Sequence, residues 1–134
     1  MQEKFIHPET IMIAGPTLEL LSRTKAFSVA AIRFYSQMPR DSAAQILGRR
    51  VLRSATSVGA QYREAQRAKS IADFLSKTEG ALQEIDETGY WLELIQDAGV
   101  DDSALLTELR TEATELLAIF VALTRTAKLN KLRG

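Results

Sequence analysis

The residues best suited to catalysis or metal binding are scarce in this chain. It has one histidine, His7, and no cysteine among its 134 residues. A di-iron helical bundle needs Glu-x-x-His pairs on two helices, and a zinc site built from histidine and cysteine needs more of both. A serine nucleophile would have to use His7, which lies in a proline-containing segment that no helix positions. We therefore expect no catalytic, cofactor-binding or metal-binding residues, and no enzymatic activity.

Carboxylates are the one remaining source of metal ligands. Glu84 and Glu87 stand at i, i+3 on a predicted helix, which would bring both to one face. A solvated or ion-paired face explains this spacing better than a metal site does. Phosphate-binding glycine motifs are absent as well, because the sequence contains neither a P-loop nor a Gly-x-Gly-x-x-Gly run.

Hydrophobic spacing predicts the elements that carry these residues. We expect an extended N-terminal arm over residues 1–16 and a four-helix domain over residues 17–130, with Thr17 as the first helix cap. The predicted helices run over about 17–38, 41–67, 70–98 and 101–128, and Gly99 is predicted to end the third one. Short connections between four amphipathic helices predict an all-α, antiparallel up-and-down bundle.

The predicted core follows one apolar stripe on each helix. The stripes are Phe27, Ala30, Ala31, Phe34 and Met38; Leu47, Val51, Ala55, Val58, Tyr62 and Ala65; Ile71, Phe74, Leu75, Leu82, Ile85 and Leu92; and Leu106, Leu109, Ala113, Leu116, Phe120 and Leu123. No signal peptide and no apolar run of membrane-spanning length is expected, so we predict a cytoplasmic protein with no membrane partner.

Charge is strongly segregated although the net charge is zero. Residues 33–69 carry a net charge of +6, residues 70–116 carry −10, and residues 117–134 carry +4. The chain thus has a basic block, an acidic block and a basic tail. The tail cations are explained most simply by the dipole of the last helix.

Four arginines line one face of the second predicted helix. Arg49, Arg53, Arg63 and Arg67 fall within about 80° of one another and span about 27 Å. Such a stripe could follow the phosphates of RNA or DNA. A solvated helix back and a subunit contact are the alternatives.

The third predicted helix carries two sets of residues that its main stripe does not explain. One is the line Gly80, Glu84, Glu87 and Trp91, in which the glycine would allow a close helix approach and the tryptophan is typical of interfaces. The other is the heptad line Glu79, Asp86 and Glu93, which is typical of ion pairing between helices. We predict that both belong to a subunit interface in which this acidic helix meets a basic helix of another chain. The alternative is that Trp91 covers the core of its own chain.

Two segments have a distinctive sequence for a helix. They are Arg53-Ser54-Ala55-Thr56-Ser57-Val58-Gly59-Ala60-Gln61-Tyr62-Arg63-Glu64-Ala65 and Tyr90-Trp91-Leu92-Glu93-Leu94. Over about residues 18–125 the chain resembles the bacterial four-helix bundle family, also called the ribosomal-RNA intervening-sequence or S23-type proteins. The matching motif residues are Arg53, Ser54, Ala55, Ser57, Glu64, Phe74 and Glu84. Gln61, Ala65 and Gln66 depart from the residues common in relatives.

The resemblance implies an up-and-down bundle that assembles as a homopentamer, and it brings no established catalytic residues. Some members of the family are encoded inside intervening sequences of large-subunit ribosomal RNA genes. More distant relatives are accessory proteins that bind a reverse transcriptase and nucleic acid. We therefore expect a non-enzymatic, homo-oligomeric scaffold or accessory protein that binds RNA or DNA through a basic helix face. A protein–protein adaptor without a nucleic-acid role is the alternative.

Overall fold

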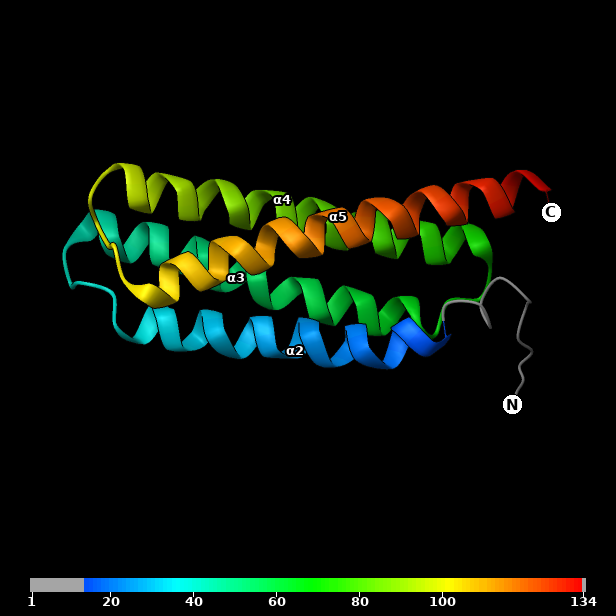
Figure 1. The fold of residues 1–134 in the computed structure, drawn as a ribbon, viewed down its shortest axis with the longest axis horizontal. Coiled ribbons are helices and arrows are strands. Elements are labelled where there is room, and N and C mark those ends of the chain that lie inside the picture. Colours follow the sequence, from blue (N-terminus) through cyan, green and yellow to red (C-terminus); the bar gives the residue numbers. More distant parts are fainter. Residues whose placement is uncertain (1–13, 134) are drawn as a thin grey trace.

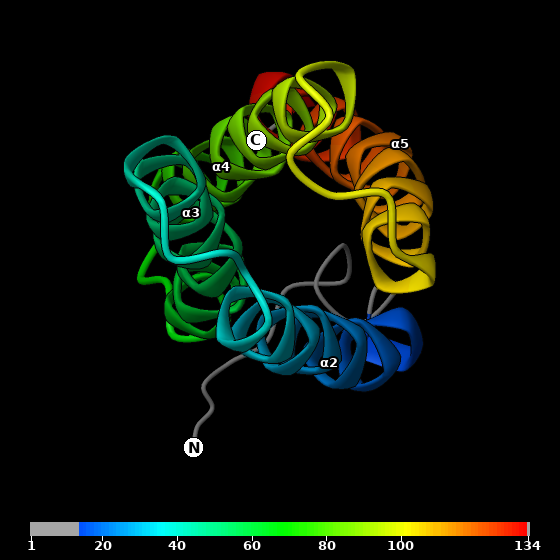
Figure 2. The same ribbon diagram turned by 90° about the vertical axis from the view of Figure 1, so that its left-hand side faces the viewer.

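Four antiparallel helices make up the computed structural model, which describes the backbone of residues 14–133 and the side chains of residues 18–133. They are α2 (Ala14–Ser36), α3 (Ser42–Ala65), α4 (Ile71–Asp97) and α5 (Ala104–Arg133). Figure 1 shows them running alternately along one long axis, and Figure 2 shows them following one another around that axis in chain order. No strand occurs in the described range. The predicted all-α up-and-down bundle is confirmed.

Local capping explains where three of the helices begin and end. The side chains of Asp41 and Ser70 accept hydrogen bonds from backbone N–H groups at the starts of α3 and α4, at 3.2 and 3.0 Å. Ser103 does the same for α5 at 3.2 Å. Gly99 has a φ of +70° just after α4, which is the left-handed conformation that a glycine stop supplies. The predicted bounds of α3 and α4 therefore agree with the structure to within two residues.

The first and last helices are longer than predicted. α2 begins at Ala14, so Thr17 is inside the helix rather than its cap, and residues 14–16 are not extended. Pro16 is compatible with this start because the first turn of a helix needs no backbone N–H partner. The predicted arm over residues 1–13 lies outside the described residues. α5 continues to Arg133, beyond the predicted end near Lys128.

The core is built from the predicted stripes. Phe27, Phe34, Tyr62 and Phe120 are its largest fully buried side chains. The rings of Tyr62 and Phe120 meet edge to face, with centroids 5.4 Å apart and planes at 74°. This contact joins α3 to α5 across the middle of the bundle. Ala30, Leu47, Leu82 and Leu123 of the predicted stripes are only half-buried and pack at the edge of the core. The prediction was wrong for Ile71 and Phe74, which lie at the start of α4, are half-buried and do not belong to this core.

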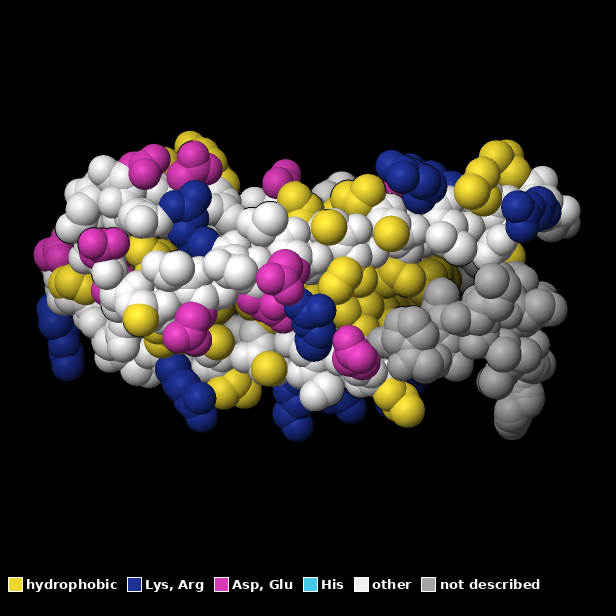
Figure 3. All heavy atoms as spheres, viewed as in Figure 1, with side chains coloured by type: hydrophobic (Ala, Val, Ile, Leu, Met, Phe, Trp, Pro, Cys, Tyr) yellow, Lys and Arg dark blue, Asp and Glu magenta, His cyan; other side chains and the backbone are white. Residues whose placement is uncertain are grey.

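The seam between α2 and α5 is the loosest of the four. α5 leans away from α2 towards its C-terminal end, and Figure 3 shows hydrophobic side chains exposed between the two helices. Arg23 of α2 bridges this seam by pairing with two carboxylates of α5, Glu112 at 2.6 Å and Glu115 at 3.1 Å. The hydrogen bond to Glu112 raises the pKa of Arg23 above its ordinary value despite the opposing effect of burial.

We expect Phe120→Ala to destabilise the bundle by about 3–5 kcal/mol, because it removes a fully buried ring and leaves a cavity beside Tyr62. Chemical denaturation at a fixed protein concentration measures this. Val121→Ala is the matched control, since Val121 is the next residue and 37% exposed, and it should cost well under half as much. Equal losses in the two variants would contradict the assigned core.

Candidate nucleic-acid and subunit interface

The outer face of α3 presents the arginines predicted to bind nucleic acid. Arg49, Arg53 and Arg63 point outward from the helix, and Arg67 lies in the turn that follows it. All four are exposed. Within the described part of the chain, Arg49, Arg63 and Arg67 make no ion pair.

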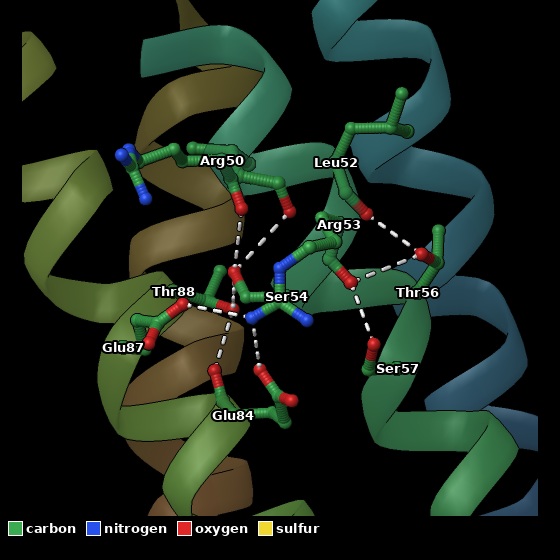
Figure 4. Close-up of polar contacts among 10 residues, drawn as sticks. Arg50, Leu52, Arg53, Ser54, Thr56, Ser57, Glu84, Glu87 and Thr88 are labelled. Carbon is green, nitrogen blue, oxygen red and sulfur yellow. Dashed lines mark hydrogen bonds and ion pairs between the residues drawn. The ribbon is translucent and has the colours of Figure 1, made fainter. Parts of the chain in front are cut away.

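Arg53 differs from the other three because α4 neutralises it. Its guanidinium lies 3.0 Å from Glu84 Oε1 and 3.1 Å from Glu87 Oε1 (Figure 4). The hydrogen bond to Glu87, together with the negative charge of Glu84, raises the pKa of Arg53. A residue predicted to contact nucleic acid and two residues predicted to contact a subunit thus meet inside one chain. A helical wheel could not show this, because it describes one helix at a time.

A buried pair of hydroxyl groups lies next to this ion pair. Ser54 donates to the carbonyl of Arg50 at 2.9 Å and accepts from Thr88, whose hydroxyl is 2.7 Å away. Both side chains are fully buried between α3 and α4 (Figure 4). Two small hydroxyl residues let the helices pack closely while satisfying each other's hydrogen bonds. They fix the height of α3 relative to α4.

Gly80 and Trp91 also face α3. A Cβ added to Gly80 would overlap the side-chain oxygen of Gln61, so the space beside this glycine is filled by the flexible amide end of a side chain from α3 of the same chain. The guanidinium of Arg50 lies 5.0 Å from the centre of the Trp91 ring, in the range of a cation–π contact. The line Gly80, Glu84, Glu87 and Trp91 therefore packs on α3 of its own chain, and a subunit contact through it stays a prediction.

The heptad line Glu79, Asp86 and Glu93 lies on the other side of α4, towards α5. Glu79 pairs with Lys128 of α5 at 3.2 Å. Asp86 and Glu93 make no ion pair among the described residues. They border a hollow of about 620 Å³ between the two helices.

Two further residues of this hollow went unnoticed in the sequence patterns. Gly89 and Tyr90 line it from α4, and Thr114 and Leu117 line it from α5. Tyr90 is 54% exposed although it is a large aromatic residue. A glycine in the middle of a long helix was the signal that could have marked this place.

Neither metal binding nor membrane crossing finds support in the described residues. No group of three or more histidine, cysteine, aspartate or glutamate residues could hold a metal ion there. None of the helices in that range has the length and apolar content needed to cross a bilayer.

Residues 16–122 match the family model of the 23S rRNA-intervening sequence protein. The chain belongs to this family. A crystal structure of a protein with unknown function from the S23 ribosomal protein family of Bacteroides thetaiotaomicron VPI-5482 is also similar. The two are 30% identical, with a TM-score of 0.72, and the match covers 78% of this chain and 96% of the other. None of the curated proteins matches the chain. The resemblance drawn from the α3 and α4 motifs is confirmed.

A double-mutant cycle on Arg53→Gln and Glu84→Gln should give a coupling energy of roughly 0.2–1 kcal/mol at low salt, because Arg53 is largely exposed to solvent. The coupling should shrink further as salt screens the charges. The control cycle pairs Arg49→Gln with Glu84→Gln and should give no coupling. A zero value for the first cycle at low salt would contradict the ion pair.

Proposed function

We propose that this protein is a non-enzymatic, homo-oligomeric helical scaffold of the cytoplasm that binds RNA or DNA through the basic face of α2 and α3. The homopentamer implied by the family resemblance is the proposed assembly. The observation that carries the proposal is the distribution of charge over the folded bundle. Residues 14–69, which include α2 and α3, carry ten bases and three acids, whereas residues 70–116 carry a net charge of −10 and residues 117–134 carry +4.

The basic face has free cations suited to phosphate. Arg49, Arg63 and Arg67 of the predicted stripe are exposed and without a carboxylate partner in the described chain, and Lys25 and Arg33 of α2 are exposed as well. Phosphate contacts of this kind give binding that does not depend on sequence and falls steeply with salt. In a ring the face would be repeated in every subunit, so weak contacts could add up.

A protein–protein adaptor is the second candidate. The observation that favours it is the hollow between α4 and α5, where Asp86 and Glu93 would repel phosphate and attract a basic segment. The neutralisation of Arg53 also shortens the run of free cations on α3. Absence of RNA and DNA binding at low salt, together with a defined protein partner, would select this candidate.

We expect Arg33→Gln with Arg67→Gln, which remove two exposed cations without a carboxylate partner in the described chain, to weaken RNA and duplex DNA binding in mobility-shift or anisotropy titrations. The slope of log affinity against log salt should fall by about 0.9 for each arginine that no longer neutralises a phosphate of duplex DNA. Arg53→Gln is the matched control, because the same basic face loses a charge that Glu84 and Glu87 already neutralise. Oligomeric state is checked by sedimentation in each variant. An unchanged salt slope in the double variant would count against nucleic-acid binding by this face.

Sedimentation velocity and light scattering on the wild-type chain test the assembly itself. We expect a discrete oligomer at micromolar concentration, with five subunits if the family resemblance extends to stoichiometry. A stable monomer at these concentrations would refute the oligomeric part of the proposal while leaving nucleic-acid binding to be judged by the titrations.

A further inference from the structure

No packing contact within its own chain requires a glycine at position 89, in the middle of α4. A glycine in a helix interior costs roughly 1 kcal/mol relative to alanine. A Cβ added to Gly48 would lie 2.9 Å from the ring of Tyr35, so packing explains that glycine, whereas one added to Gly80 would meet only the flexible amide end of Gln61. A Cβ added to Gly89 would meet nothing within 4 Å. The missing side chain leaves room for something outside this chain.

The surroundings of Gly89 are suited to a helix from another molecule. The hollow between α4 and α5 combines small residues in its lining with the exposed ring of Tyr90. Asp86 and Glu93 flank it with charges that no base of the described chain neutralises. Arg110 also borders the hollow and keeps its charge, because its guanidinium donates to the neutral amide oxygen of Gln96, but the carboxylates of the lining outnumber it. The site therefore favours a docking surface that is basic and partly apolar.

The opposite side of the same bundle has these properties. Figure 2 shows α2 and α3 on one side of the axis and α4 and α5 on the other. The α2–α3 side carries Arg49 and Arg63 without ion partners in the described chain. It also exposes Ile32 of α2 and Ile46 of α3, each 50% accessible.

Contacts between helices show that the two surfaces have the same height, meaning the same position along the long axis of the bundle. Three contacts set the height of α4 against α3: Arg50 with Trp91, Ser54 with Thr88 and Glu64 with Lys77. Because α3 and α4 run antiparallel, the numbers of two residues at the same height have a constant sum, which is 141 or 142 in these three pairs. Those of Arg49 with Glu93 and of Arg63 with Glu79 add up to 142, so each arginine is level with one carboxylate.

The apolar residue Ile32 is level with the hollow as well. Ser28 bonds to the carbonyl of Ala55 at 3.5 Å, and Tyr35 packs on Gly48, which fixes α2 against α3. Ile32 lies between these two contacts and is thus level with about residue 51 of α3. The same height on α4 is that of Tyr90 and Trp91, and Gly89 is the residue before them. Rotation about an axis parallel to the helices leaves every height unchanged, so a second copy brought round by such a rotation would meet these groups in register.

We propose that the α2–α3 side of one copy docks on the α4–α5 hollow of a second copy. Arg49 then pairs with Glu93 of that copy, and Ile32 packs over Gly89 and Tyr90. At the other end of the interface, Arg63 pairs with Glu79 of the second copy, a carboxylate that also pairs with Lys128 of its own chain. The two surfaces are different, so the interface is heterologous and a closed ring satisfies every copy. This inference rests on the homo-oligomer in the proposed function and identifies its contact surface.

In the docked arrangement, some cations of the basic face contact the neighbouring copy and others remain open to phosphate. Arg49 and Arg63 cannot hold a neighbour and a phosphate at once. Nucleic acid bound by the assembled protein would then depend on the cations that the neighbour leaves open, of which Arg67 is one.

The experiment measures self-association by sedimentation at low and moderate salt for Arg49→Glu, Glu93→Arg and the double exchange R49E/E93R. We expect each single reversal to raise the dissociation constant at least about tenfold, as like charges then face each other. The double exchange should return it to within about threefold of wild type, because the pair is restored with opposite polarity. Glu108→Arg is the control: the same charge change at an exposed residue that does not line the hollow should have little effect.

Gly89→Ala provides a second readout that a charge effect does not move. The added methyl group should leave the isolated chain at least as stable to denaturation, since helix propensity improves and nothing within 4 Å is disturbed. Self-association should nevertheless weaken at least about threefold.

Three outcomes would overturn the inference: no rescue by R49E/E93R, no effect of Gly89→Ala on association, or a monomeric wild type. The first two leave the proposed homo-oligomer standing with a different interface. The third refutes the oligomer as well.

Discussion

The packing of α3 on α4 is the contact on which the other features of this molecule depend. The hydroxyl pair Ser54–Thr88 allows only a narrow range of heights between the two helices. At that height Arg53 reaches Glu84 and Glu87, and Arg50 covers Trp91. The same height decides which groups on the outside of the bundle are level with one another.

Burial and charge then divide the surface into two sides. One apolar stripe per helix turns inward, and the edge-to-face contact of Tyr62 with Phe120 ties α3 to α5 through the core. The chain order places the basic helices α2 and α3 next to each other and the acidic helix α4 opposite α2, whereas α5 is acidic only in its first half and basic towards its end. A bundle with zero net charge thereby becomes strongly polar across its short dimension. Such a polarity favours contact with surfaces of opposite charge, whether phosphate or another protein.

The family assignment agrees with the four-helix fold, but it says little about function. Residues 16–122 match the 23S rRNA-intervening sequence protein, and the similar crystal structure belongs to a protein with unknown function. Neither names a ligand. The functional argument therefore has to come from the residues of this chain, above all from Gly89, which has no packing role in the subunit that contains it.

Local chemistry in the sequence determined the helices, their caps and the core. The period of the apolar residues identifies the buried face of each helix, and Asp41, Ser70 and Gly99 mark their ends, because both signals act within a few residues. The scarcity of histidine and cysteine likewise shaped the expected chemistry before any fold was known. Only the tertiary structure decided that Arg53 is neutralised, that the Trp91 line faces α3, and that Asp86 and Glu93 border a hollow. The physical reason is that the rotation and height of one helix relative to another depend on side chains distant in sequence, which no single-helix pattern contains.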